Sequence, residues 1–200
     1  MVNQKIEISE FDSITPIEKK IIDAFMSIYA DKPIEKISIK MITNRAGLNR
    51  STFYLHYTDI YDLLEIIESK YHKISQAIAS NAVKAMYQNE LLADALPEIE
   101  FYESNIAHLK ILLCVPGKSN LDQIMRREVL KAITFTLENK ALWNHELNEY
   151  ALEYITSAQV ATIIHWIQND MRIPLYKISN LIQVLAVNGA LTYFESQKGK

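Results

Sequence analysis

The stretch from Ser38 to Tyr57, SIKMITNRAGLNRSTFYLHY, constrains this chain most, because it predicts two short helices joined by a tight turn. Ser38 can cap the first helix, since a serine oxygen accepts a hydrogen bond from an amide at a helix start. Gly47 stands where the chain must turn, and glycine adopts a positive φ without a Cβ clash. Asn49 can cap a second helix that begins near Arg50. This order is that of a helix-turn-helix, whose second helix enters the DNA major groove.

The charge of this stretch is compatible with DNA contact. It contains Lys40, Arg45 and Arg50 and no aspartate or glutamate. Other side chains in it can bond to phosphate oxygens or base edges; they are Thr43, Asn44, Asn49, Ser51, Thr52, Tyr54, His56 and Tyr57. A solvated, basic helical hairpin would have the same pattern, so spacing and charge alone leave both interpretations open.

The run AGLNRSTFYLHYTDIYDLL resembles the signature of TetR-type bacterial transcriptional regulators. That signature reads Ala-Gly-Val-Ser, two variable residues, Thr-Leu-Tyr, a variable residue, His/Tyr-Phe, and soon a Leu-Leu pair. The corresponding residues here are Ala46, Gly47, Leu48, Asn49, Thr52, Phe53, Tyr54, His56, Tyr57, Leu63 and Leu64. The resemblance covers roughly the first quarter of the chain. It departs at Ile60, where members often carry a phosphate-contacting lysine, and at Ser51, where glycine is common.

The helix-turn-helix pattern and the resemblance together predict which residues contact DNA. Residues at the start of a recognition helix meet base edges, and the first helix of the motif crosses the backbone. The resemblance implies phosphate contacts for Tyr54 and His56, and it aligns Tyr57 with an aromatic that mostly packs. The predicted DNA-binding residues are Lys40, Thr43, Arg45, Asn49, Arg50, Ser51, Thr52, Tyr54, His56 and Tyr57. We expect Phe53 to pack in the core, and core packing is the competing interpretation for Leu55.

The composition sets limits but does not itself indicate DNA binding. The chain has 200 residues and a net charge of -3, with a pI near 6.0. A nucleic-acid footprint needs only a local basic patch. The single Cys114 forms no internal disulfide and suits a reducing cytosol. No signal peptide or apolar run of about 18 residues is visible, so we expect a cytoplasmic protein with no membrane partner.

Helical spacing of apolar residues continues through the chain and predicts an all-α fold of about nine helices. Thr15, Pro16 and Glu18 predict a capping box that opens the first helix. Asp59 can cap a long fourth helix that runs to about residue 78. Two helices are expected over 97–114, with a break at Pro116-Gly117. We predict a DNA-binding domain over 1–58 and a sensing and dimerisation domain over 59–200.

The last two helices are expected over about 145–171 and 174–195. The first of them carries an apolar stripe, formed by Leu147, Ala151, Tyr154, Ala158, Ala161 and Ile164. By resemblance, the two helices pair with their copies in a homodimer, which implies a roughly palindromic operator. The predicted interface residues are Ile163, Trp166, Leu181, Val184, Leu185, Asn188 and Gly189. Gly189 then either allows a close approach across the two-fold axis or faces its own core.

No constellation of residues indicates an enzyme. The four glycines are too far apart for a Walker loop or a dinucleotide fingerprint, and no G-x-S-x-G run occurs. No histidine follows a glutamate by three residues, as di-iron bundles require, and one cysteine with scattered histidines does not predict a closed zinc site. We therefore expect a non-enzymatic protein with no cofactor and no metal.

The resemblance implies an effector cavity in the body. Pockets are mostly apolar and aromatic with a few polar groups, and the body offers such residues: Phe101, Tyr102, His108, Cys114, Met125, Phe135 and Trp143. The same set would serve as ordinary core. The leading prediction is a homodimeric repressor that binds a double-stranded DNA operator and is switched by a small-molecule effector. A regulator switched by a protein partner and an interaction-only adaptor are the alternatives.

Overall fold

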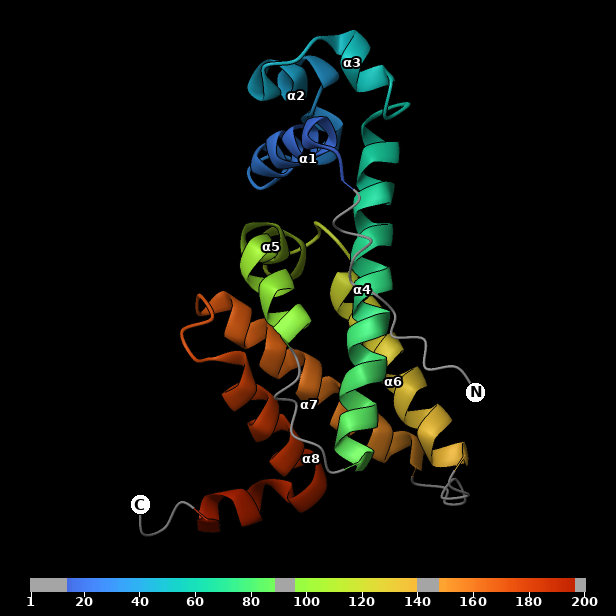
Figure 1. The fold of residues 1–200 in the computed structure, drawn as a ribbon, viewed down its shortest axis with the longest axis vertical. Coiled ribbons are helices and arrows are strands. Elements are labelled where there is room, and N and C mark those ends of the chain that lie inside the picture. The colour runs from blue at the N-terminus through green and yellow to red at the C-terminus, as the bar shows by residue number, and fades with distance from the viewer. Residues whose placement is uncertain (1–13, 89–95, 140–147, 197–200) are drawn as a thin grey trace. The chain divides into compact units, whose positions relative to one another are not determined.

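The computed structural model describes residues 14–88, 96–139 and 148–196. These residues form eight α-helices, one short 3-10 helix and no strand, which confirms the all-α prediction (Figure 1). The elements are α1 (Pro16–Tyr29), η2 (Ile34–Lys36), α2 (Ile39–Ala46), α3 (Arg50–Tyr54), α4 (Ile60–Gln88), α5 (Leu96–Cys114), α6 (Leu121–Asn139), α7 (Asn148–Gln168) and α8 (Leu175–Ser196). Trp143 and Leu147, both named in the sequence analysis, lie outside the described residues.

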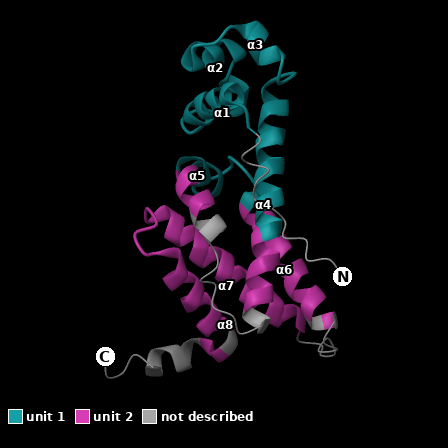
Figure 2. Ribbon diagram, in the orientation of Figure 1, with its two compact units in different colours: residues 1–77, 107–121 teal, residues 78–106, 122–200 magenta. Residues whose placement is uncertain are grey.

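The chain divides into two compact units (Figure 2). Unit 1 comprises residues 1–77 and 107–121, so the end of α5 and the turn after it belong with the N-terminal helices. Unit 2 comprises residues 78–106 and 122–200. The two units are defined by the packing of their residues. The boundary at residue 58 between a DNA-binding domain and a sensing and dimerisation domain stays a prediction.

Local capping signals place the first helices of unit 1. Thr15 and Glu18 form the predicted capping box, with Pro16 in the first turn of α1. At the start of α4, Asp59 Oδ1 accepts hydrogen bonds from the amides of Tyr61 (2.8 Å) and Asp62 (2.9 Å), which confirms Asp59 as the cap. These caps satisfy amide groups that have no partner within the helix.

The region predicted as two helices over 97–114 is a single helix, α5. Within this helix, Asn105 donates its side-chain amide to the carbonyl of Phe101 one turn earlier, at 2.9 Å. Neither Gly nor Pro interrupts the chain between Phe101 and Cys114, so nothing forces a break there. The predicted break at Pro116-Gly117 is confirmed, with Gly117 at a φ of +74°.

The core of unit 2 reveals which way α7 faces. Leu152 packs with Val83 and Ile133, and Thr156, Val160 and Ile167 are also buried on α7. The apolar stripe that the sequence predicted on this helix lies on another face. Tyr154 is 73% exposed, and Ala151, Ala158 and Ala161 are exposed as well. Apolar residues occur with helical spacing on both faces, so periodicity alone could not identify the core.

Gly189 interrupts α8 rather than lying within a regular helix. Its φ of +78° and ψ of 163° are non-helical. A Cβ atom added at this position would have no neighbouring heavy atom of the chain within 4 Å. Backbone conformation therefore accounts for glycine here, because L-residues rarely adopt a positive φ.

Candidate DNA interface

Short-range interactions build the turn between α2 and α3. Ser38 Oγ accepts a hydrogen bond from the Met41 amide at 3.3 Å, as predicted for the cap of α2. Gly47 ends α2 in the left-handed conformation, with φ 67° and ψ 34°. The Leu48 amide then donates to the carbonyl of Thr43 at 2.9 Å. The glycine and these caps reverse the chain within a few residues, so that α3 follows directly on α2.

Asn49 occupies the N-cap position of α3, but its side chain makes no capping hydrogen bond. Only its carbonyl takes part, accepting from the Thr52 and Phe53 amides. The sequence prediction of a side-chain cap is therefore wrong at this residue. The exposed Asn49 side chain stays available to an external partner.

The short helix α3 has one outward and one inward face. The exposed residues are Arg50, Ser51, Tyr54 and the following Leu55. Phe53 is 0% exposed, and the centre of its ring lies 5.6 Å from the centre of the Tyr57 ring. Residues three and four apart share a helix face, so the exposed side chains form one surface. We call Asn49, Arg50, Ser51, Tyr54 and Leu55 the α3 outer face.

Two predicted DNA contacts are buried in unit 1 and are therefore corrected. Thr43 is 2% exposed, and its hydroxyl lies 3.4 Å from the carbonyl of Lys40. Tyr57 is 3% exposed, and burial, with the nearby acids Glu18 and Asp62, raises its pKa to about 12. Side chains enclosed in this way cannot reach a phosphate or a base edge.

The other predicted residues differ in how freely they can meet DNA. Lys40 is exposed, and Thr52 and His56 are half-buried. Arg45 is exposed but donates to Ser27 Oγ of α1 at 2.7 Å, which ties α2 to α1. Leu55, for which core packing was the competing interpretation, is 82% exposed. Leu55 follows a helix of only five residues. Such a helix is too short for the periodicity of apolar residues to show which side chains are exposed.

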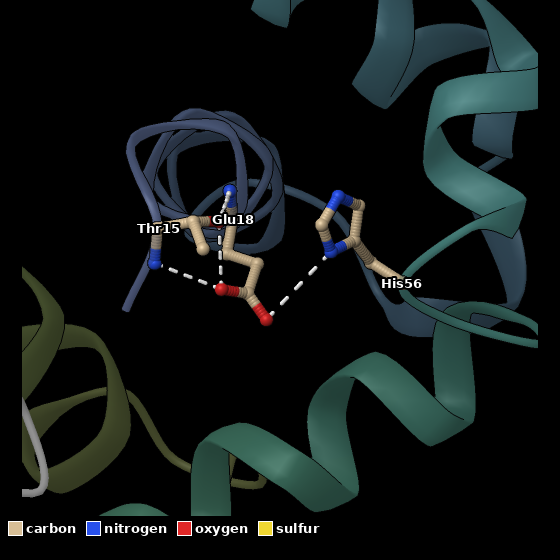
Figure 3. Close-up of polar contacts among 3 residues, drawn as sticks. All are labelled: Thr15, Glu18 and His56. Atoms are coloured by element: carbon tan, nitrogen blue, oxygen red, sulfur yellow. Dashed lines mark hydrogen bonds and ion pairs between the residues drawn. The ribbon is translucent and has the colours of Figure 1, made fainter. Parts of the chain in front are cut away.

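His56 lies beside the first turn of α1 (Figure 3). Its Nδ1 is 3.7 Å from Glu18 Oε1. The other oxygen of this carboxylate, Oε2, accepts hydrogen bonds from the amide (2.8 Å) and hydroxyl (2.7 Å) of Thr15. These bonds, the backbone one foremost, together with the charge of His56, hold the Glu18 pKa below its ordinary value. Glu18 thus joins the start of α1 to the residues that follow α3.

Glu18 gives unit 1 a predictable response to acid. Because its folded pKa is depressed, its ionised form stabilises the folded state above its ordinary pKa, and this contribution is lost as the pH falls through the folded pKa. We expect Glu18→Gln, which keeps the capping oxygen, to destabilise the protein near neutral pH and to lose less stability on acidification. Urea titrations between about pH 6 and about pH 3.5 measure this difference. An identical pH dependence in the two proteins would contradict the role of Glu18.

The start of α4 presents acidic and apolar groups where the resembling family often has a lysine. Ile60 is the first residue of α4, and Asp62 Oδ2 accepts from the Thr58 amide at 2.7 Å. The phosphate contact implied by a lysine at this position therefore has no counterpart in the side chain of Ile60.

The end of α5 contacts α1 within unit 1. His108 Nε2 is 3.2 Å from Asp23 Oδ1; burial lowers the His108 pKa, and the Asp23 carboxylate opposes this shift. In the turn after α5, Lys118 Nζ donates to the Lys32 carbonyl at 2.6 Å and lies 4.5 Å from the ring centre of Tyr29. These contacts therefore hold the 107–121 segment against α1 and the residues that follow it.

The residues predicted to bind an effector are divided between the two units. His108 and Cys114 belong to unit 1, whereas Phe101, Tyr102, Met125 and Phe135 belong to unit 2. Phe101 and Tyr102 are buried, but Phe135 is 69% exposed, which argues against a place in an interior pocket.

One predicted interface residue, Trp166, also differs from expectation. Trp166 is buried, packs edge-to-face on Tyr102 at 5.4 Å, and donates its indole N–H to the Ile173 carbonyl at 2.6 Å. It serves the core of unit 2, which corrects its assignment to the dimer surface. Leu181, Val184 and Leu185 of α8 are partly exposed, as are Ile163 of α7 and Gly189.

Among the described residues, no group of three or more His, Cys, Asp or Glu side chains could hold a metal ion. Within the same part of the chain, no helix is both long and apolar enough to span a membrane.

Comparison with known proteins identifies a related family for the C-terminal part. Residues 96–188 match a TetR-type family described as "Transcriptional regulator C-terminal region". The body of this chain resembles a transcriptional regulator. This match supports the class of function and does not extend to the helix-turn-helix. No curated protein matches the chain.

Three solved structures resemble the chain at a distance. "Dihydroxyacetone kinase operon activator DhaS" has 20% identity and a TM-score of 0.48, over 86% of this chain and 95% of that one. The fatty acid degradation regulator FadR from Bacillus halodurans has 16% identity and a TM-score of 0.49, over 88% and 97%. FadR from Bacillus subtilis in complex with stearoyl-CoA has 17% identity and a TM-score of 0.47, over 86% and 98%.

Proposed function

We propose that this protein is a transcriptional regulator that reads an operator through the α3 outer face. The observation that carries the proposal is the division of α3 into a buried anchor, Phe53, and an exposed polar and basic surface led by Arg50. Arginine can donate two hydrogen bonds to a guanine edge, and asparagine can do so with adenine. A helix held by a buried aromatic presents such groups in a fixed orientation.

The electrostatics of the motif support the same proposal. Residues 38–57 contain no acidic side chain, although the whole chain is slightly acidic. Lys40 is exposed on α2, the helix that crosses the phosphate backbone in helix-turn-helix proteins. A local basic surface on an acidic protein favours binding through this surface over general adhesion to nucleic acid.

We further propose a homodimer built on α7 and α8. The exposed face of α7 carries Tyr150, Tyr154, Ala158 and Ala161, and both tyrosines are 73% exposed. An exposed helix face with so few charged residues is expected to be buried against another protein surface. The partly exposed Leu181, Val184 and Leu185 of α8 add to the apolar surface that a second copy of the chain could bury. A two-fold axis would present two recognition helices to a roughly palindromic operator.

Repression with release by an effector is the mode of control that we propose. An inducer must bind the DNA-incompetent arrangement more tightly, since equal affinity for both arrangements shifts nothing. The His108–Asp23 contact joins α5 to α1 inside unit 1 and provides a route along which a change in α5 would reach α1. A ligand that raises the melting temperature but leaves operator affinity unchanged would favour control by a protein partner.

Selection of bound fragments from the source genome provides the operator for a direct test. We expect Arg50→Ala to lose about 1–3 kcal/mol of operator-binding free energy and to relax specificity at one base position. Lys40→Ala should lower the affinity for all DNA sequences alike and reduce the dependence of log affinity on log salt concentration by about one unit. Arg172→Ala removes a positive charge from unit 2, where the Arg172 side chain is 78% exposed, and serves as the control. Fluorescence anisotropy at several salt concentrations measures all three. Unchanged operator affinity in Arg50→Ala would disprove the assigned reading surface.

A further inference from the structure

Two polar side chains on α7 are buried without a hydrogen-bond partner among the described residues. They are Thr156, through Oγ1, and Gln159, through Nε2. Thr156 is 2% exposed, and the two residues are one helical turn apart, on the side of α7 that faces the core. Buried polar groups in folded proteins are nearly always paired. Two neighbouring exceptions on one helix face therefore indicate a partner that the polypeptide itself does not supply.

Other threonines in the chain show that Thr156 forgoes an available bond. Thr162 on the same helix donates its hydroxyl to the Ala158 carbonyl at 2.8 Å, and Thr136 on α6 donates to the Ala132 carbonyl at 2.9 Å. This bond to the preceding turn is the usual solution for threonine inside a helix. The Thr156 hydroxyl has no such partner, so it is free to bond to another molecule.

Apolar contacts bound this polar pair along α7. One turn before Thr156, Leu152 packs with Val83 and Ile133. Two turns after Gln159, Trp166 packs against the ring of Tyr102. A mostly apolar wall with a few polar groups is typical of sites for small molecules.

Two charged groups of α6, the helix whose Ile133 packs with Leu152 of α7, already have partners. Arg126 Nη1 donates to Ser157 Oγ at 2.6 Å, and Glu128 Oε1 accepts from Lys131 at 3.0 Å. A charged ligand would need an opposite charge to offset its loss of water. The amide nitrogen of Gln159 is a donor, and the Thr156 hydroxyl can donate or accept. The chemistry therefore favours an uncharged ligand with an oxygen acceptor.

We propose that Thr156 and Gln159 form the polar anchor of a ligand site in unit 2, and that the ligand is a neutral, mostly apolar small molecule with a carbonyl oxygen. This inference rests on the proposed regulatory function for its biological meaning, because it names the ligand class of the effector site. Neither Thr156 nor Gln159 was among the effector-binding residues predicted from the sequence.

The first test measures stability without ligand. Protein refolded from denaturant, and so freed of any carried ligand, is compared with Thr156→Val and Gln159→Met. Because each variant removes an unpaired buried polar group, we expect each melting temperature to rise by about 2–4 °C. Thr162→Val removes a hydroxyl that is already bonded and should give no rise. Unchanged or lower melting temperatures in both Thr156→Val and Gln159→Met would overturn the proposal. They would mean that the two polar groups have hydrogen-bond partners in the ligand-free protein.

The second test uses butyrophenone and butylbenzene, which have nearly the same shape and differ by a carbonyl oxygen. We expect the ketone to raise the melting temperature of the wild type more than the hydrocarbon does, and this difference to disappear in Gln159→Met. Equal responses to the two compounds in the wild type, or a difference that persists in Gln159→Met, would overturn the assigned ligand class. Neither test involves DNA, so the outcome is separate from that of the operator experiments.

Discussion

Ala158→Arg should convert the protein to a monomer and lower its operator affinity by about 10²–10⁴-fold, the range that linking two binding modules typically contributes. Ala158 lies between Tyr154 and Ala161 on the exposed face of α7. In an isolated chain, an arginine at this position would be solvated and would change the free energy of unfolding little. At a two-fold interface it would bring two unpaired positive charges together in a dry environment, where the cost is large.

Sedimentation velocity at micromolar concentration measures the dimer, and anisotropy on the selected operator measures DNA binding. Gln123→Arg places the same charge at an exposed position of α6 and should change neither quantity. The melting temperature of Ala158→Arg, extrapolated to low protein concentration, should match that of the wild type. A variant that stays dimeric would mean that the second copy covers a different surface.

Phe53→Ala should destabilise unit 1 by about 3–5 kcal/mol, the usual loss when a buried phenylalanine is truncated. Phe53 is fully buried, with its ring 5.6 Å from Tyr57 and 5.9 Å from Tyr54. A helix of five residues has little stability of its own. The α3 outer face therefore depends on this anchor, and operator binding should be lost together with the fold of the motif.

Hydrogen exchange is the suitable measurement for Phe53→Ala, because it reports the stability of each segment separately, whereas a single melting temperature describes the whole chain. Exchange should rise across residues 39–57 and change little in α7. The neighbouring Tyr54→Ala is the matched control. Tyr54 is 58% exposed, so its removal should leave exchange near the wild-type level. Protection of residues 39–57 in Phe53→Ala equal to that of the wild type would contradict the anchoring role.

The sequence by itself determined the features that depend on neighbours a few residues apart. The Thr15–Glu18 box, the Ser38 cap, the left-handed Gly47 and the Asp59 cap all involve groups within four residues of each other. Local sterics and local hydrogen bonds set these, whatever surrounds them. The all-α class follows for the same reason, because helical periodicity repeats along the chain.

Only the tertiary structure decided which faces are covered. Thr43 and Tyr57 have the polar groups of DNA contacts, yet packing within unit 1 encloses them. On α7, Tyr154 and Ala158 belong to the apolar stripe visible in the sequence, but the core of unit 2 takes Leu152, Thr156 and Val160. Contacts such as His108–Asp23 join residues 85 positions apart. Burial depends on which helices meet, and that is settled by the packing of the whole unit, which the residues of a single helix do not encode.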